Sequence, residues 1–364
     1  MPAKGVAISG TPHPAAPNPS GKEVIFMSSK IGLALVSALA LGLSACSSAE
    51  QPESLVVLSH DSFDFPETLI KQFAEETGID VSIQQIGDGG ELANQLVLTK
   101  DAPLGDVVYG LDNTVSYRIS GQDVIAETSV ASPDKALDYA GEPGLIPIDQ
   151  GDVCVNYDKA WFQGKQPPQT FEDLAKPEYK GLLVAMNPAS STPGMAFMLA
   201  TIEHFGTDGW LDYWKQLRDN GVKITNGWSD AFSVDYSAGE GAGPFPMMVS
   251  YGSSPAYSVN EAKTESTTAA LPQTCYRQVE YAGVLQGSKN PEAAAKFVEF
   301  MLTPAVQEAI SEVTYMHPAN PEANAPEDLV NFGPLATEMT ALPADEVAAN
   351  AEAWLRAWQA EVIG

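Results

Sequence analysis

Two long strand-like segments, at residues 146–158 and 267–286, place the strongest constraint on the fold of this chain. They read IPIDQGDVCVNYD and TTAALPQTCYRQVEYAGVLQ, and an α/β pattern lies between them. A chain that leaves one lobe on the first crossing and returns on the second forms two lobes around a cleft, which can open about the pair of strands. We therefore expect a two-lobed, hinged molecule whose first lobe is discontinuous in sequence.

Strand-like and helix-like patterns alternate before the first crossing. Residues 55–59 and 80–86 read as strands, and a helical pattern at 66–79 separates them. Pro66 opens this helical pattern and Gly78 closes it, as expected at helix ends. Alternating strands and helices favour βαβ units and a largely parallel sheet, so the predicted fold class is α/β.

The expected organisation follows from the two crossings. Lobe 1 is predicted to comprise residues 54–150 together with 278–325, and lobe 2 residues 151–277. Residues 326–364 form a C-terminal helical segment with a clear amphipathic pattern at 344–362, and its lobe is left open.

The beginning of the chain contains an export signal. Residues 31–43 form a short uncharged apolar run after Lys30, and Leu43, Ser44 and Ala45 precede Cys46. A charged start, a short apolar run and small residues before a cleavage site are typical of a signal peptide. The LSAC sequence resembles the lipobox of bacterial lipoproteins, in which the cysteine thiol is acylated.

We therefore expect residues 1–45 to be removed and residues 46–53 to tether the protein through lipid on Cys46. The tether would hold it at the outer face of the cytoplasmic membrane, in an extracellular or periplasmic location. Residues 1–26 precede the signal and do not belong to it, so Met27 is the predicted start.

The chain has three cysteines. If Cys46 carries lipid, Cys154 and Cys275 remain as one pair in an oxidising compartment, where a disulfide is expected. The alternative is two separate buried thiols.

Charge and motif content exclude several functions. The formal net charge of −28 argues against nucleic acid or anionic lipid as a partner and mildly favours a cationic ligand. The chain lacks HExxH, GxSxG and P-loop motifs, and His60, His204 and His317 are scattered. We expect a binding protein without enzymatic activity, cofactor or metal.

Three features are candidates for ligand binding. SSTPG at 190–194 combines an N-cap with Pro in a first turn, which suits an anion site or a plain helix cap. GDGG at 87–90 places a carboxylate where a ligand can approach closely, or forms an ordinary turn. Aromatic side chains in loop-like segments can stack on a flat cationic ligand or simply pack the loops: Trp228, Tyr251, Tyr257 and Tyr315.

The order of these motifs resembles one family. HDSF, GDGG, DVVYGLDN, SSTPG, KITNGWSDAF, SYGSSPAY, a Tyr-Arg-Gln-Val-Glu crossing, KFVEFMLTPAVQEAI and YMHPAN follow one another between Leu55 and Trp358. This succession resembles the thiamine-binding proteins of thiamine ABC importers, within the type II periplasmic-binding-protein superfamily. The resemblance implies two α/β lobes, each a mixed β-sheet flanked by helices, joined by a two-strand hinge.

The resemblance also implies a site for thiamine or its mono- or diphosphate between the lobes. Its residues here would be Asp88, Gly89, Ser191, Thr192, Trp228, Tyr251, Gly252, Ser253, Ser254, Pro255, Tyr257, His60 and Tyr315. Ser191 and Thr192 would receive the hydroxyethyl or phosphate end, and Trp228 would stack on the ligand.

The chain departs from the family in its aromatic residues. His60 stands where the family commonly has Tyr, and Tyr315 where it commonly has Trp. A Trp after DSF is missing, and Phe65 is the nearest aromatic residue. These changes weaken the expected aromatic enclosure on the lobe-1 side.

The resulting prediction is a monomeric lipoprotein that captures thiamine and delivers it to an importer permease. Iron capture is an alternative, although ferric-binding relatives usually have paired tyrosines and no Tyr-Tyr pair occurs here. Polyamine capture is another, although only Asp88 is well placed by motif. An exported thiamine-degrading enzyme is the third, and it would need a free cysteine nucleophile.

Overall fold

The computed structural model describes residues 54–63, 65–132, 142–337 and 341–364. The predictions for the signal peptide, Cys46 and the tether fall on residues 1–53 and therefore lie outside the described residues. Among the described residues, no helix combines the length and apolar character needed to cross a bilayer.

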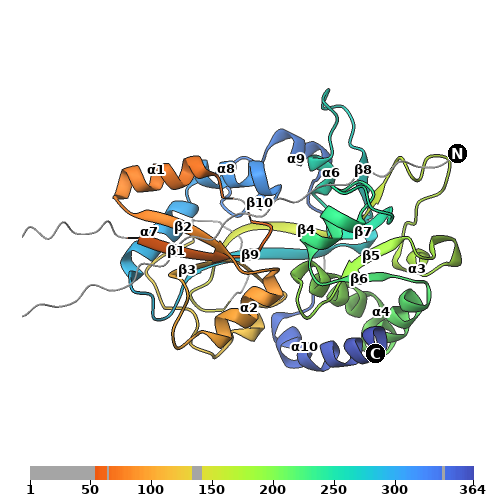
Figure 1. Ribbon diagram of the computed structural model, residues 1–364, viewed down its shortest axis with the longest axis horizontal. Coiled ribbons are helices and arrows are strands. Elements are labelled where there is room, and N and C mark those ends of the chain that lie inside the picture. The colour runs from red at the N-terminus through yellow and green to blue at the C-terminus, as the bar shows by residue number, and fades with distance from the viewer. Residues whose placement is uncertain (1–53, 64, 133–141, 338–340) are drawn as a thin grey trace, which may run out of the picture. The chain divides into compact units, whose positions relative to one another are not determined.

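The strands form one hydrogen-bonded sheet in the order β2-β1-β3-β9-β4-β7-β5-β6, with β8 and β10 added to β4 (Figure 1). Strands β1, β2 and β3 are parallel to one another, and so are β5, β6 and β7. Strand β9 is antiparallel to β3 and β4, and β4 is antiparallel to β7. The bounds are β1 Ser54–Ser59, β2 Asp80–Gln85, β3 Val107–Asp112, β4 Ile146–Asp158, β5 Leu183–Met186, β6 Lys223–Thr225, β7 Met247–Tyr251, β8 Thr268–Ala270, β9 Tyr276–Val284 and β10 His317–Pro318.

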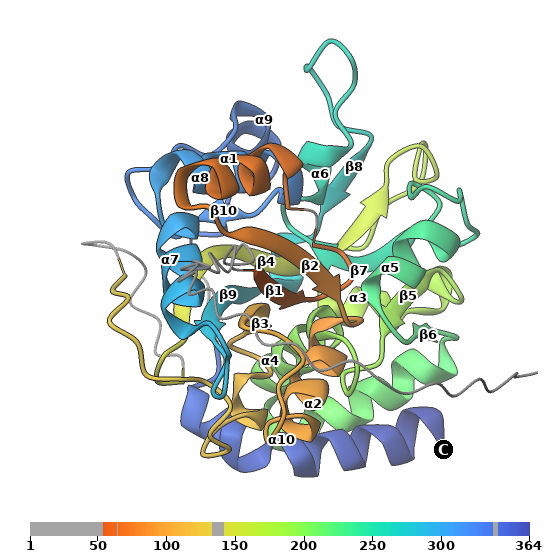
Figure 2. The ribbon, with the colours of Figure 1, turned by 60° about the vertical axis from the view of Figure 1, so that its left-hand side comes forward.

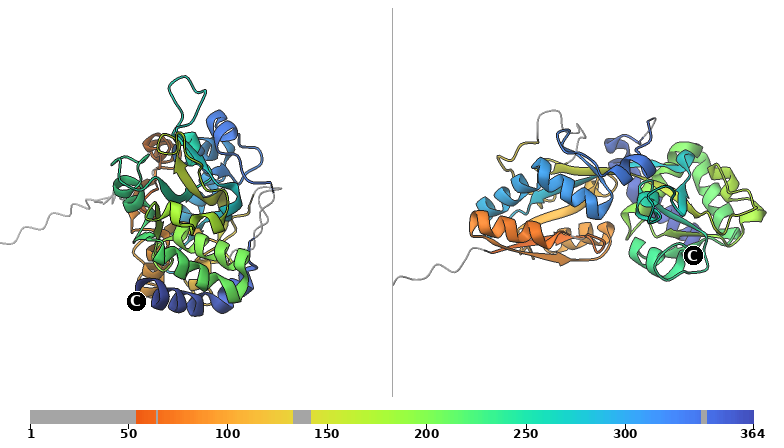
Figure 3. Two further views of the ribbon diagram at one scale, coloured as in Figure 1. Left: turned by 90° about the vertical axis from the view of Figure 1, so that its right-hand side faces the viewer. Right: turned by 90° about the horizontal axis from the view of Figure 1, so that it is seen from above.

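The two crossing strands connect two lobes, which are seen side by side in Figure 3. Ile146 to Val153 of β4 pair with β9, and Val153 to Asp158 pair with β7 and β8. One strand therefore runs through both lobes, as the long strand-like segment at 146–158 predicts. The mixed α/β fold and its two-strand connection are confirmed.

The second crossing was predicted as one strand over 267–286, and that prediction is wrong. The structure divides it into β8, a 3₁₀ turn at Pro272–Thr274 and β9. Pro272 has no backbone N–H and opens the turn, so the ladder cannot continue through it.

The helices cover both faces of the sheet. The main ones are α1 Glu67–Thr77, α2 Gly89–Leu98, α4 Thr192–Asp219, α7 Pro291–Met301, α8 Pro304–Thr314 and α10 Ala344–Trp358. Short ones are α3 Phe171–Leu174, α5 Trp228–Asp230, α6 Ser254–Tyr257 and α9 Glu327–Phe332, with 3₁₀ turns η1 Ser116–Arg118, η2 Pro177–Tyr179 and η4 Pro272–Thr274 and π-helical turns η3 Ala231–Asp235 and η5 Gln359–Ile363. Gly78, at φ 74°, ends α1 in the left-handed conformation, as its position in the sequence predicts.

Alternate residues of the first strands enter different cores. Val57 and Val107 pack with α1, α7 and α8, whereas Leu58 and Val108 pack with α2. This alternation is the period-2 pattern of a strand that is buried on both faces. Figure 2 shows α1, α7 and α8 on one side of β1–β3 and α2 with α10 on the other.

The C-terminal helix α10, whose lobe the sequence left open, packs against α4. The Trp358 ring meets the Trp214 ring edge-on at 5.4 Å, and both side chains are fully buried. Helix α10 also contacts η1 of the first lobe. It therefore spans elements of both lobes.

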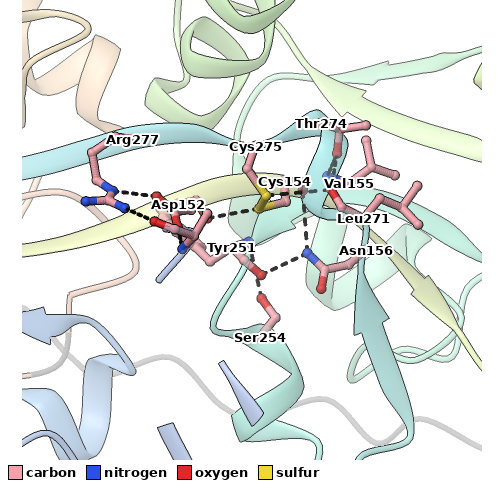
Figure 4. Close-up of a disulfide and its surroundings, with 11 residues drawn as sticks. Asp152, Cys154, Val155, Asn156, Tyr251, Ser254, Leu271, Thr274, Cys275 and Arg277 are labelled. Atoms are coloured by element: carbon pink, nitrogen blue, oxygen red, sulfur yellow. Dashed lines mark hydrogen bonds and ion pairs between the residues drawn. A yellow bond between two sulfur atoms is a disulfide. The ribbon is translucent and has the colours of Figure 1, made fainter. Parts of the chain in front are cut away.

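A disulfide joins Cys154 and Cys275, as predicted (Figure 4). The pairing of β4 with β9 ends at Val153 and Tyr276. The disulfide joins Cys154, which follows Val153, to Cys275, which precedes Tyr276. Beside it, the Val155 amide donates to Thr274 Oγ1 at 2.9 Å. The disulfide thus secures the point where the two crossing segments diverge.

Candidate ligand-binding site

A cavity of about 280 Å³ lies between the two lobes. Its lining comes from the loop after β1, from α5 and η3, from β7 and α6, from β9, and from the end of α8. The residues are His60, Ser62, Trp228, Ser229, Phe232, Ser233, Glu240, Tyr251, Ser253, Ser254, Tyr257, Glu280, Val313, Thr314, Tyr315 and Met316. Both lobes contribute, so the cavity can enclose a ligand only when the lobes are close together.

The structure brings part of the predicted site together at this cavity. The predicted residues that line it are His60, Trp228, Tyr251, Ser253, Ser254, Tyr257 and Tyr315. The predicted residues outside its lining are Asp88, Gly89, Ser191, Thr192, Gly252 and Pro255. The ligand contacts of both groups stay predictions.

Trp228 anchors an aromatic wall. Its ring stacks on Phe232 with a centroid distance of 4.8 Å and an interplanar angle of 9°. The indole Nε1 donates to Ser250 Oγ at 3.0 Å, which fixes the orientation of the ring. Phe232 was missed in the sequence, although its i+4 spacing from Trp228 in GWSDAF would place both rings on one helical face.

Tyr257 and Tyr315 meet across the cavity from different lobes. Tyr257 ends α6 and Tyr315 follows α8, and their rings pack edge to face at 5.5 Å and 87°. Tyr315 has φ 56°, a left-handed conformation that is unusual for a bulky residue. Tyr257 is 54% exposed, so this pair marks the solvent edge of the site.

Asp88 links elements of the two lobes through hydrogen bonds from backbone amides. Its Oδ1 accepts hydrogen bonds from the amides of Gly89 at 2.7 Å and Thr192 at 2.9 Å. Its Oδ2 accepts from the Trp228 amide at 3.0 Å. Burial raises the pKa of Asp88, although the hydrogen bonds from Trp228 and Thr192 act in the opposite direction. The carboxylate therefore ties α2 in one lobe to α4 and Trp228 in the other.

The SSTPG segment begins a helix, as predicted. Ser191 is the N-cap of α4, and its Oγ accepts from the Gly194 amide at 3.3 Å. The Thr192 amide, which an external anion would use, is bonded to Asp88. At Gly89, an added Cβ would lie 2.5 Å from Thr192 Cγ2, so this glycine lets α2 approach α4 closely.

A row of acidic side chains crosses the central strands near the cavity. Asp112 on β3 and Asp149 on β4 are the cross-strand partners of Glu280 on β9. All three are buried, and Glu280 also lines the cavity. Like charges directly opposite one another are destabilising, so this row favours protonation of some of its members.

Tyr109 and His60 contact the carboxyl groups of this acidic row. The Tyr109 hydroxyl bonds to Asp149 and lies 3.1 Å from Glu280 Oε2. His60 Nε2 lies 3.4 Å from Glu280 Oε1. Burial and the charge of Glu280 raise the pKa of Asp149 well above its usual value. Burial likewise raises the pKa of Asp112 to about 7.

Glu280 was not among the ligand-binding residues predicted from the sequence. The signal that could have indicated it is an acidic residue inside an otherwise largely apolar strand, QVEYAGV, in the second crossing. Such a residue needs a partner when it is buried. Both cysteines of the described chain are in the disulfide, so the described site contains no thiol nucleophile.

Two lobes joined by crossing strands, with a mainly aromatic and polar cavity between them, define a solute-binding protein of the periplasmic-binding-protein fold. The chain belongs to the bacterial extracellular solute-binding protein family, whose model matches residues 68–337. It is accordingly an extracytoplasmic solute-binding protein and not an enzyme.

Within this family, the chain is similar to proteins described as thiamine-binding periplasmic proteins. The chain is 32% identical over 319 residues to the thiamine-binding periplasmic protein of Escherichia coli K12, covering 85% of this chain and 93% of that one. It is 30% identical over 323 residues to the protein of the same description from Brucella suis biovar 1, with coverages of 86% and 93%.

Solved structures of solute-binding proteins have the same fold as this chain. A periplasmic thiamin binding protein superposes with a TM-score of 0.74 at 30% identity, covering 85% of this chain and 96% of that one. A ferric binding protein from Campylobacter jejuni superposes with a TM-score of 0.67 at 20% identity, covering 84% and 99%. The second match reflects the shared fold alone.

Proposed function

We propose that this protein captures thiamine, or its mono- or diphosphate, in the cavity between its lobes and delivers it to the permease of an ABC importer. The observation that carries the proposal is the aromatic and acidic lining of this cavity. Thiamine combines a flat aminopyrimidine with a cationic thiazolium ring. Aromatic faces attract such a cation, and a small enclosed cavity suits a ligand of this size.

Each part of the ligand has a counterpart in the lining. The stacked pair Trp228 and Phe232 offers one flat face, and Tyr251 lies near it with its ring centroid 6.1 Å from that of Trp228. Tyr257 and Tyr315 would cover the ligand from the solvent side. Relatives described as thiamine-binding periplasmic proteins, about 30% identical over most of their length, support the same ligand.

The lobes in this proposal are residues 54–150 with 278–325 and residues 151–277, and β4 and β9 are the hinge. Ligand binding would close the lobes, and Asp88 would stabilise the closed form by accepting amides from both sides. Small-angle scattering should show a smaller radius of gyration with saturating thiamine than without it. An unchanged radius would contradict the hinge.

The proposal includes a lipid anchor on Cys46 and a monomeric protein that docks on the permease. In cells that express the full chain, wild-type protein should incorporate labelled fatty acid and stay in the membrane fraction. A Cys46→Ser variant should not be labelled, and equal labelling of both would overturn the anchor.

The direct test of the ligand is calorimetric titration of the purified protein with thiamine and its two phosphates. We expect saturable binding of one ligand per protein. Absence of heat with all three would overturn the proposed function.

A further inference from the structure

We infer that Glu280 is the counter-charge that recognises the cationic part of the ligand and that Tyr109 and Asp149 position its carboxylate. This inference rests on the proposed function and adds a specificity-determining residue to it. Glu280 ends the Tyr-Arg-Gln-Val-Glu motif, but it is not among the ligand-binding residues that the resemblance implies.

The position of Glu280 is unusual for a carboxylate. It lies on the central strand β9, it is 4% exposed, and it nevertheless lines the cavity. The other acidic residue in the lining, Glu240, is exposed to solvent. A buried charge interacts with a ligand through less intervening water than an exposed one, so Glu280 has the stronger effect.

The hydrogen bonds of Tyr109 limit how protons can be shared among Tyr109, Asp149 and Glu280. Its hydroxyl lies within bonding distance of Asp149 Oδ2 and Glu280 Oε2. A phenol has one proton, so two such bonds require a second proton from one of the two carboxyl groups. Asp149 lies outside the cavity lining, and burial together with the charge of Glu280 raises its pKa. Because Glu280 lines the cavity beside His60 and Asp149 does not, we assign this proton to Asp149, and the Tyr109 hydroxyl then donates to Glu280 Oε2.

The surroundings leave this charge available for a ligand. Asp112 and Asp149 flank Glu280 on β3 and β4, and Tyr251 lines the same cavity from β7. His60 is the only basic side chain in the described cavity lining, with Nε2 3.4 Å from Glu280 Oε1. Burying a carboxylate is unfavourable, and a cationic ligand beside Glu280 offsets that cost.

The test compares thiamine with thiochrome, its fused derivative that lacks the thiazolium charge. Wild-type protein should bind thiamine at least tenfold more tightly than thiochrome in calorimetric titrations. Glu280→Gln should weaken thiamine binding at least tenfold and change thiochrome binding less than threefold. Glu178→Gln, at an exposed residue outside the cavity lining, is the control and should change both affinities less than threefold.

Two positioning variants test the proton assignment. Asp149→Asn keeps a neutral side chain and should retain thiamine affinity within threefold. Tyr109→Phe should reduce the preference for thiamine over thiochrome and leave thiochrome affinity nearly unchanged, which a merely structural role would not do. Thermal melting of each variant confirms that it is folded.

Equal loss of thiamine and thiochrome affinity in Glu280→Gln, or no loss of either, would overturn the role of Glu280. If that variant does not fold, the wild-type comparison decides, because equal affinity for the two compounds overturns the inference. Absence of thiamine binding to wild-type protein would instead overturn the proposed function.

Discussion

Removing the disulfide by a double Cys154→Ala, Cys275→Ala substitution should lower the free energy of unfolding by about 3–5 kcal/mol. The bond closes a loop with a sequence separation of 121 residues. The chain-entropy relation for a loop of that length gives about 5 kcal/mol at 25 °C, and native disulfides typically contribute about 2–5 kcal/mol. We expect a value below the upper figure, because the unfolded chain without the bond retains some compactness.

Urea unfolding followed by tryptophan fluorescence measures this change. The midpoint should fall for the double variant and, to the same extent, for wild-type protein unfolded in a reducing agent. The double variant itself should not respond to the reducing agent, which makes it the internal control.

The substitution also separates stability from ligand binding. The disulfide cysteines do not line the cavity, so thiamine affinity of the folded double variant should stay within threefold of wild type. A loss of unfolding free energy below about 1 kcal/mol would refute the account of the disulfide as the clamp on the crossing strands.

Three further variants follow from the site. Trp228→Ala should weaken thiamine binding by about 1–3 kcal/mol in calorimetry, through loss of stacking and cation–π attraction. Trp161→Ala, outside the cavity, is its control, and equal effects would contradict the aromatic wall. Asp88→Ala should lower the free energy of unfolding by about 2–5 kcal/mol, because it removes a helix cap and leaves amides of Thr192 and Trp228 without their acceptor. A change under about 1 kcal/mol in urea unfolding would show that this carboxylate does not hold the elements together. Burial raises the pKa of Asp112 to about 7, so the folded protein binds this proton more tightly than the unfolded chain does. The contribution of Asp112 to stability is therefore fully present below about pH 4 and is lost as the pH rises to about 7, by up to about 4 kcal/mol. Unfolding of Asp112→Asn between pH 4 and 8 should lack this component, and a pH profile parallel to wild type would contradict it.

Much of the architecture was predictable because its signals are local. The long strand at 146–158, the helix cap at Ser191 and the helix end at Gly78 each depend on a few neighbouring residues. The remaining pair of cysteines likewise predicted the disulfide. The second crossing was misjudged because Pro272 was read as part of a strand, although proline cannot donate to a ladder.

The site was harder to predict because its contacts join distant segments. Asp88 reads as a ligand-facing carboxylate in GDGG, and the sequence does not reveal that it accepts hydrogen bonds from the amides of residues 192 and 228. Glu280 acquires its importance from its cross-strand neighbours Asp112 and Asp149, and strand register is not visible in one sequence. The predicted candidates therefore included loop residues that line the cavity but not Asp112, Asp149 or Glu280.

The most direct test of the central claim is one calorimetric titration series of purified wild-type protein with thiamine, thiamine monophosphate and thiamine diphosphate. We predict saturable one-to-one binding of at least one of them with a dissociation constant of about 1 μM or lower, which corresponds to roughly −8 kcal/mol. No detectable binding of any of the three would contradict the account.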